Sequence, residues 1–218
     1  MGSVALERPR TELSNTECVF CSSSLVASRS PFDEVVAEAE AGILLPALGM
    51  MVEGYFLAVT REHCLSLAHS SPQLIERMYQ WVDFLTEVLS PEFGNYLVVE
   101  HGSCSGSSSG ACIDHAHLHL VPIADALGPI LLADSKMSWL EIKDLGSIAG
   151  PHPRGYVSLQ LDGRLWISEN PSIPSQWLRR RIAALLGQEV WDWAIDPGEK
   201  ALHDTSLRLK RIQWPKVP

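Results

Sequence analysis

Residues 115–122 read "HAHLHLVP", in which every second residue is a histidine and the residues between them are apolar. The histidines are His115, His117 and His119. Side chains of a β-strand alternate between two faces, so a strand would place the three imidazoles on one face and the apolar side chains on the other. A helix would bring only His115 and His119 together. The alternation therefore predicts a strand with one face in the core and three imidazoles on the opposite face.

Three imidazoles on one face favour a chemical role, because imidazole can transfer protons, attack as a nucleophile or bind a metal near neutral pH. The alternative is a solvent-facing strand that uses histidine by coincidence. One imidazole could attack the phosphorus of a phosphate ester while its neighbours orient it and neutralise charge. Residues 106–112, "GSSSGAC", lie just before the strand. The backbone N–H groups and hydroxyls of such a loop can cradle phosphate oxygens, although a solvated linker has the same composition.

Composition limits the class of protein. The chain has 218 residues, of which 46% are hydrophobic and 20% are charged, as in an ordinary globular protein with a large core. Its formal net charge of −9 argues against binding to nucleic acid polymers or anionic membranes. No apolar run approaches the length of a membrane span, and residues 1–16 are expected to be a loose leader rather than a secretory signal. The five cysteines are unevenly spaced, so a reducing cytoplasm is expected.

The remaining sequence predicts strands joined by loops and accompanied by helices. The expected elements are strands over 55–59 and 95–102, a helix over 71–90, a hairpin over 155–168 and a helix over 172–187. Asp162–Gly163 is expected to form the hairpin turn, and Gly187 is expected to end the last helix. Residues 31–48 fit either a strand pair or a short helix followed by a strand. Because no regular βαβ alternation is visible, the pattern favours an α+β fold with an antiparallel sheet.

Residues 115–121, "HAHLHLV", resemble the signature of the histidine-triad (HIT) superfamily, in which three histidines alternate with apolar residues and two apolar residues follow. Residues 53–67, "EGYFLAVTREHCLSL", and the "VVEHG" strand occur in the same order as in that family. The likeness extends over about residues 17–125. It implies a HIT-like catalytic domain over 17–128, an antiparallel sheet with a long helix. Residues 129–218 would then form a C-terminal extension packed on that domain, with a hairpin and a helix.

The resemblance also implies an activity. Family members are nucleotide hydrolases or nucleotidyl transferases, which cleave a phosphate-linked nucleoside monophosphate through a covalent histidine intermediate, and many are homodimers. His117 would be the nucleophile, and His119 would contact the phosphate or the leaving group. The residues that would hold phosphate oxygens are Ser109, Gly110, Ala111 and Cys112. Small relatives often carry Gly-Gln-Ser at this turn, so the chain loses side-chain hydrogen bonds there. Transferase branches often carry glutamine at the third triad position, so His119 favours hydrolysis.

A second motif suggests a metal site. Cys18-Val-Phe-Cys21 has the spacing of a zinc knuckle, and the alternative is a pair of buried or redox-active thiols. Zinc-containing members of the same family complete such a pair with the histidine that ends the "TREH" strand and with the first triad histidine. The resemblance therefore implies a structural zinc ion held by Cys18, Cys21, His63 and His115. Cys64 would point the other way along its strand.

Two other functions remain open from the sequence. One is a pathway-specific enzyme of the same fold that acts on a non-nucleotide substrate. The other is a non-enzymatic, zinc-stabilised binding protein. Among lesser candidates, His101 precedes the serine-rich loop and could reach the site. Gln176 and Arg180 would share a helix face and could meet a phosphate, although most basic runs are solvated. Trp191 and Trp193 are expected to be packing anchors.

Overall fold

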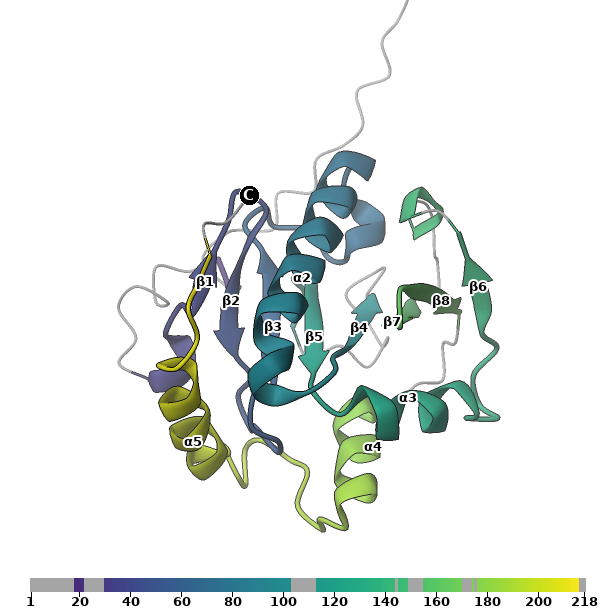
Figure 1. The fold of residues 1–218 in the computed structure, drawn as a ribbon. Helices are drawn as coiled ribbons and strands as arrows, with labels where there is room; N and C mark the ends of the chain where they lie inside the picture. The colour runs from purple at the N-terminus through teal and green to yellow at the C-terminus, as the bar shows by residue number, and fades with distance from the viewer. Residues whose placement is uncertain are drawn as a thin grey trace, which may run out of the picture.

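The computed structural model describes residues 18–21, 30–102, 113–143, 145–148, 155–169, 174 and 176–215. Its centre is an antiparallel sheet of eight strands in the order β1-β2-β3-β5-β4-β7-β8-β6 (Figure 1). The strands are β1 Ala37–Glu38, β2 Gly42–Pro46, β3 Phe56–Thr60, β4 Leu97–Gly102, β5 His117–Val121, β6 Leu140–Ile142, β7 Tyr156–Leu161 and β8 Arg164–Ser168. The helices are α2 Pro72–Phe93, α3 Ala124–Leu132, α4 Trp177–Leu186 and α5 Glu199–Leu209, with 3-10 turns at Pro31–Asp33, Leu67–His69 and Leu145–Ile148. The predicted α+β fold with an antiparallel sheet is confirmed.

Strand β5 lies between β3 and β4, at the middle of the sheet. Its apolar side chains, Leu118 and Leu120, are fully buried in the core cluster that contains α2. The histidines therefore lie on the opposite face, as the alternation predicted. On that face His119 is paired with Leu57 of β3 on one side and with Val99 of β4 on the other.

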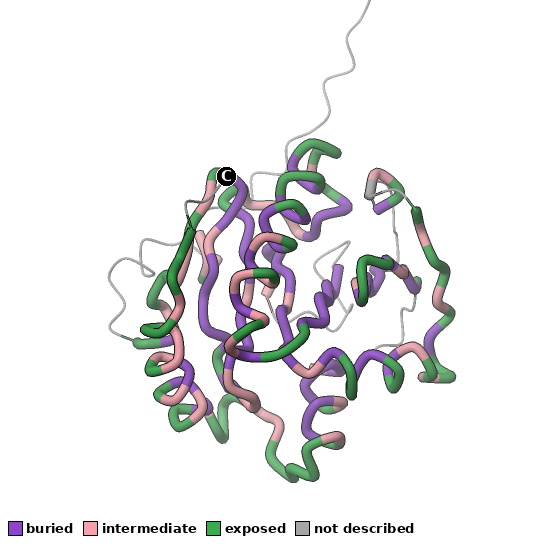
Figure 2. Tube along the Cα trace, in the orientation of Figure 1, coloured by how far each residue is buried: buried purple, intermediate pink, exposed green. Residues whose placement is uncertain are grey.

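Helix α2 covers the first face of the sheet, crossing in front of β3 and β5 in Figure 1. It begins where predicted, since the Ser71 hydroxyl accepts a hydrogen bond from the Leu74 N–H and Pro72 occupies the first turn. It continues three residues beyond the predicted end, through Pro91 to Phe93, and stops at Gly94, which has a φ of 102°. Figure 2 shows its sheet-facing side buried and its outer side exposed.

The opposite face is covered by the segments after the triad. A second core cluster joins sheet residues such as Val99 and Leu159 with Leu127 of α3 and with Leu178 and Ile182 of α4. Helix α4 ends at Gly187, which has the left-handed φ of 64° expected of a C-terminal glycine. This packing encloses the face on which His117 and His119 lie. No helix among the described residues is long and apolar enough to cross a membrane.

Two local predictions can be compared directly with the backbone. Residues 31–48 contain the strand pair β1–β2, preceded by a single 3-10 turn, rather than a longer helix. The hairpin β7–β8 turns at Asp162 and Gly163, whose φ values of 50° and 71° give the two left-handed residues of a tight hairpin turn. The domain boundary that we predicted after residue 128 lies within α3, and β6, β7 and β8 extend the same sheet.

Candidate functional site

A hydrogen bond to the backbone sets the orientation and the tautomer of His117. Its Nδ1 lies 2.6 Å from the backbone carbonyl oxygen of His115. A carbonyl can only accept, so Nδ1 carries the hydrogen and donates it. Burial lowers the pKa of His117, against a smaller opposite effect of that hydrogen bond, so the ring is neutral near pH 7. A neutral ring protonated at Nδ1 keeps its free electron pair on Nε2.

His119 lies next to His117, with ring centroids 4.9 Å apart. Its Nδ1 is 2.8 Å from the hydroxyl of Tyr55, which can orient the ring. Burial lowers the pKa of His119 well below its ordinary value, and the neighbouring His117, His101 and Arg179 lower it further. His119 is therefore also neutral near pH 7, and its Nε2 can exchange a hydrogen bond or a proton with a ligand.

The two imidazoles line a cavity of about 360 Å³. Its other lining residues are mostly apolar: Val19, Ala47, Leu48, Tyr55, Leu57, His101, Ile113, Gln176, Leu178, Arg179 and Trp193. Gln176, Leu178, Arg179 and Trp193 belong to the part of the chain after residue 128. The C-terminal region thus forms one wall of the cavity around the triad. Of these four residues, the sequence had indicated only Gln176 as one that could meet a phosphate.

Of the three consecutive arginines at 179–181, Arg179 is the one that lines this cavity. Its side chain is buried, with Nε donating to the carbonyl of Trp191 and Nη1 donating to the carbonyl of Leu48. Arg180, which we had considered as a phosphate ligand, instead lies over the ring of Trp191 at 3.8 Å. That interpretation was wrong because the helix turns Arg180 away from the cavity that Gln176 lines. Trp191 is a packing residue as predicted, whereas Trp193 is a cavity wall.

His101 also reaches the cavity. It lies on β4 two residues after Val99, so it shares the face of His119, and the two ring centroids are 6.0 Å apart. Burial lowers the pKa of His101 to about 4, and His117 contributes in the same direction. The sequence made His101 a lesser candidate because it precedes the serine-rich loop, and it lines the cavity because side chains alternate along β4.

A second cluster lies beside the triad. The ligand-type atoms of Cys18, Cys21, His63 and His115 all lie within 4.8 Å of one another, so the cluster could hold a metal ion. Phe20, between the two cysteines, places its ring 5.6 Å from that of His115 and 5.7 Å from that of His117. Burial and the neighbouring Cys18 raise the pKa of Cys21 to about 11, and a bound cation would reverse this effect.

The tautomer of His115 suits this cluster. Its Nε2 lies 2.8 Å from the carbonyl oxygen of Thr60, so Nε2 donates and Nδ1 keeps the free electron pair. Nδ1 lies 3.4 Å from the sulfur of Cys18 and 3.4 Å from that of Cys21. A histidine that binds a metal commonly donates its other N–H to a carbonyl in this way. Cys64 lies outside the cluster, near the Thr60 hydroxyl.

The phosphate-holding turn that we predicted at Ser109, Gly110, Ala111 and Cys112 lies outside the described residues.

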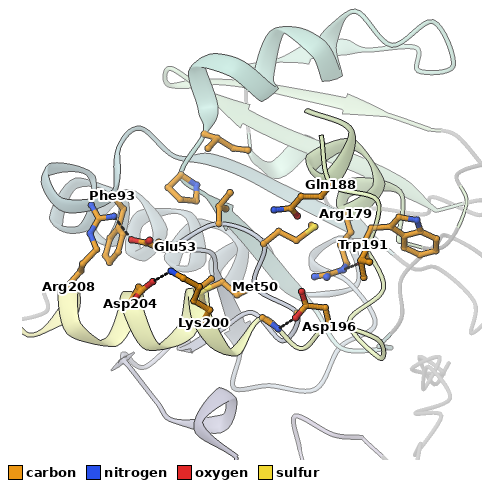
Figure 3. A pocket seen from close by; sticks show the side chains of 18 residues that line it. Met50, Glu53, Phe93, Arg179, Gln188, Trp191, Asp196, Lys200, Asp204 and Arg208 are labelled. Carbon is orange, nitrogen blue, oxygen red and sulfur yellow. Dashed lines mark hydrogen bonds and ion pairs between the residues drawn. The ribbon is translucent and has the colours of Figure 1, made fainter. Parts of the chain in front are cut away.

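A different cavity, of about 560 Å³, lies beside α5 (Figure 3). Charges along it are paired within the protein: Arg208 with Glu53, and Lys200 with Asp204. Arg179 lines both cavities.

Comparison with known proteins gives distant likenesses. No protein-family model and no curated protein matches the sequence. Solved structures that resemble the chain include a HIT-like protein involved in cell-cycle regulation from Bartonella henselae, 14% identical over 49% of this chain and 76% of that chain, with a TM-score of 0.41. A HIT family hydrolase from Clostridium thermocellum is 21% identical over 50% of this chain and 92% of its own, with a TM-score of 0.39. Yeast Ap4A phosphorylase in complex with AMP is 16% identical over 66% of this chain and 62% of its own, with a TM-score of 0.41.

Proposed function

We propose that this chain is a histidine-triad-type enzyme that cleaves or transfers a nucleoside monophosphate through a covalent intermediate on His117. The observation that carries this proposal is the hydrogen bond from His117 Nδ1 to the carbonyl of His115, which leaves a neutral Nε2 available in a cavity. Nucleophilic catalysis by histidine needs an imidazole with a free lone pair. His117 has one, and a second neutral imidazole lies beside it in the cavity.

The chemistry follows from these positions. His117 Nε2 attacks phosphorus, a P–N bond forms, and the bond from phosphorus to the leaving group breaks. The N–H of His119 donates a hydrogen bond to the leaving group, which departs as an anion with the electrons of the broken bond, and Arg179 offsets charge on the phosphate. Water then attacks phosphorus and loses a proton to solvent, the P–N bond breaks, and the nucleoside monophosphate leaves. If an acceptor other than water attacked the same intermediate, the enzyme would be a transferase. We favour hydrolysis because the third triad residue is a histidine.

We further propose that the metal is a structural zinc ion. Atoms bound about 2.0 to 2.3 Å from one tetrahedral zinc ion lie about 3.3 to 3.8 Å apart. The sulfur of Cys21 lies 3.1 Å from His63 Nδ1 and 3.4 Å from His115 Nδ1, close to that range. Two cysteines and two histidines fill all four positions, so the ion would stabilise the fold without touching substrate. It would fix the backbone of His115, whose carbonyl orients His117.

The decisive experiment traps the intermediate. The protein is mixed with dinucleotides, nucleotide sugars and nucleoside phosphoramidates that carry label on the phosphorus under attack, then quenched in alkali, which preserves phosphorus bonds to histidine. We expect label on wild-type protein, none on His117→Ala, and normal labelling of His203→Ala, which changes an exposed histidine of α5. Label on His117→Ala, or none on folded wild-type protein with any nucleotide, would contradict the proposal. Labelling only by non-nucleotide phosphate esters would instead favour the pathway-specific enzyme.

A homodimer and a cytoplasmic location remain predictions from the family resemblance and the cysteine pattern. Gel filtration with light scattering would measure the mass of the particle directly. The small-molecule substrate that we propose is consistent with the size of the cavity, about 360 Å³.

A further inference from the structure

Two residues that line the triad cavity have a buried side-chain atom with no hydrogen-bond partner among the described residues: Nε2 of His101 and Oε1 of Gln176. The His101 side chain is only 7% exposed. Buried polar groups in folded proteins almost always have a partner, so a pair of unsatisfied atoms in one cavity calls for a ligand. His101 comes from β4 and Gln176 precedes α4, so two distant parts of the chain place these atoms around one space.

We propose that His101 and Gln176 form a polar subsite that binds a hydroxyl group of the leaving group. This inference rests on the proposed function, because it takes His117 as the nucleophile. It adds the class of substrate: a nucleoside monophosphate joined to a hydroxylated, sugar-like or polyol-like group.

The position of the subsite points to the leaving group. The ring of His101 lies between two others, 6.0 Å from that of His119 and 5.6 Å from that of Trp177. His119 is the residue that we propose donates a hydrogen bond to the leaving group, and Trp177 follows Gln176 in the chain. The subsite is therefore next to the leaving group.

The chemistry of the two side chains selects a hydroxyl. A carboxamide oxygen accepts hydrogen bonds only, so it would repel a phosphate or a carboxylate placed directly against it, and a phosphate of the leaving group must lie outside the subsite. The neutral imidazole of His101 can donate from one nitrogen and accept at the other. A hydroxyl both donates and accepts, so it satisfies Gln176 and His101 together, whereas an anion satisfies only one of them.

The backbone holds Gln176 where the subsite needs it. Gln176 has a φ of 58° and a ψ of 28°, a left-handed conformation that residues other than glycine rarely adopt. Its side chain makes no capping hydrogen bond to α4. The carboxamide oxygen thus has no hydrogen bond to the helix or to any other described group. A bridging water is the competing occupant of such a space, and the experiment below separates the two.

The test compares two substrates that differ only in hydroxyl groups. Adenosine diphosphate esterified with glycerol releases glycerol phosphate when His117 attacks the adenosine-linked phosphorus, and the propyl ester releases propyl phosphate. The reacting bond is the same in both. We expect wild-type protein to prefer the glycerol ester by about tenfold in kcat/KM, since a missing hydroxyl leaves two buried groups unpaired.

The variants assign this preference to the subsite. Gln176→Gly removes the carboxamide and tolerates the left-handed backbone. His101→Phe removes the other partner but keeps a ring of similar shape. Either change should reduce the preference to about one- to twofold. Gln188→Gly, the same change at an exposed glutamine, should retain the full preference.

The outcomes separate this inference from the proposed function. Equal turnover of the two esters by wild-type protein would overturn the subsite and leave a bridging water as its occupant. An undiminished preference in Gln176→Gly would overturn it too, even if His101→Phe failed to fold. Labelling of His117 by other nucleotides but by neither ester would overturn the subsite alone. Absence of label with every nucleotide would overturn both proposals.

Discussion

The hydroxyl of Tyr55 lies 2.8 Å from Nδ1 of His119. This contact joins the residue before β3 to the middle of β5, and it orients the imidazole that we propose to face the leaving group. If the hydroxyl donates to Nδ1, then Nε2 carries the hydrogen that His119 presents to the leaving group. Tyr55 would then select the tautomer of His119.

Replacing Tyr55 with phenylalanine should therefore slow the reaction more than it weakens binding. We expect kcat of Tyr55→Phe to fall by about 5- to 10-fold with little change in KM, the effect of losing one hydrogen bond of about 1 kcal/mol. Steady-state kinetics on the substrate found by labelling would measure this. Tyr79→Phe is the control, because the Tyr79 hydroxyl meets Ser158 in the other core cluster. Equal losses of kcat in the two variants would contradict the role of Tyr55.

The metal cluster predicts a defined stoichiometry. Elemental analysis of the purified protein should give about one zinc ion per chain, the load of a single four-ligand site. Cys21→Ser should lose the metal and melt at a lower temperature, because metal binding contributes to folding free energy. Cys64→Ser should keep the metal, since Cys64 lies outside the cluster. A metal-free protein with an unchanged melting temperature would exclude the structural role.

Buried histidine predicts loss of stability in acid. Burial lowers the pKa of His101 to about 4, from an ordinary value of about 6.5. Between these values the unfolded chain takes up a proton that the folded chain resists, so the free energy of unfolding falls as the pH falls. His101 alone would account for about 3 kcal/mol of that loss by pH 4, with no contribution above pH 7.

Denaturant unfolding at several pH values measures this effect. The decline between pH 6.5 and pH 4 should be shallower in His101→Phe than in the wild-type protein, because the variant has no imidazole to protonate. Parallel declines in the two proteins would show that His101 titrates normally.

Gly42 at the start of β2 is predicted to tolerate no side chain. A Cβ atom there would lie 2.4 Å from the carbonyl oxygen of Val59 and 2.9 Å from the ring of Trp81. Gly42→Ala should lower the free energy of unfolding by about 2 kcal/mol or more, because the backbone of β3 must move. Gly163→Asn is the comparison, since nothing lies within 4 Å there and asparagine accepts its positive φ. Similar stability of the two variants would contradict the packing argument.

The sequence by itself determined the local elements. Strict alternation over 115–122 predicted β5 and the face of its histidines, Ser71 and Pro72 marked the start of α2, and Asp162–Gly163 marked a hairpin. Alternation, capping and turn formation depend on residues a few positions apart, so the sequence carries them directly. The family resemblance brought together the four residues of the metal cluster, including Cys18 and His115, which are 97 positions apart.

Only the tertiary structure decided what surrounds the triad. Arg179 rather than Arg180 reaches the cavity, because that choice depends on the rotation of α4 about its axis when it packs on the sheet. His101 and Gln176 both line it because β4 pairs beside β5 while α4 folds back over the same face. Strand alternation gives the face on which His101 lies, but packing between segments far apart in the chain decides what covers that face.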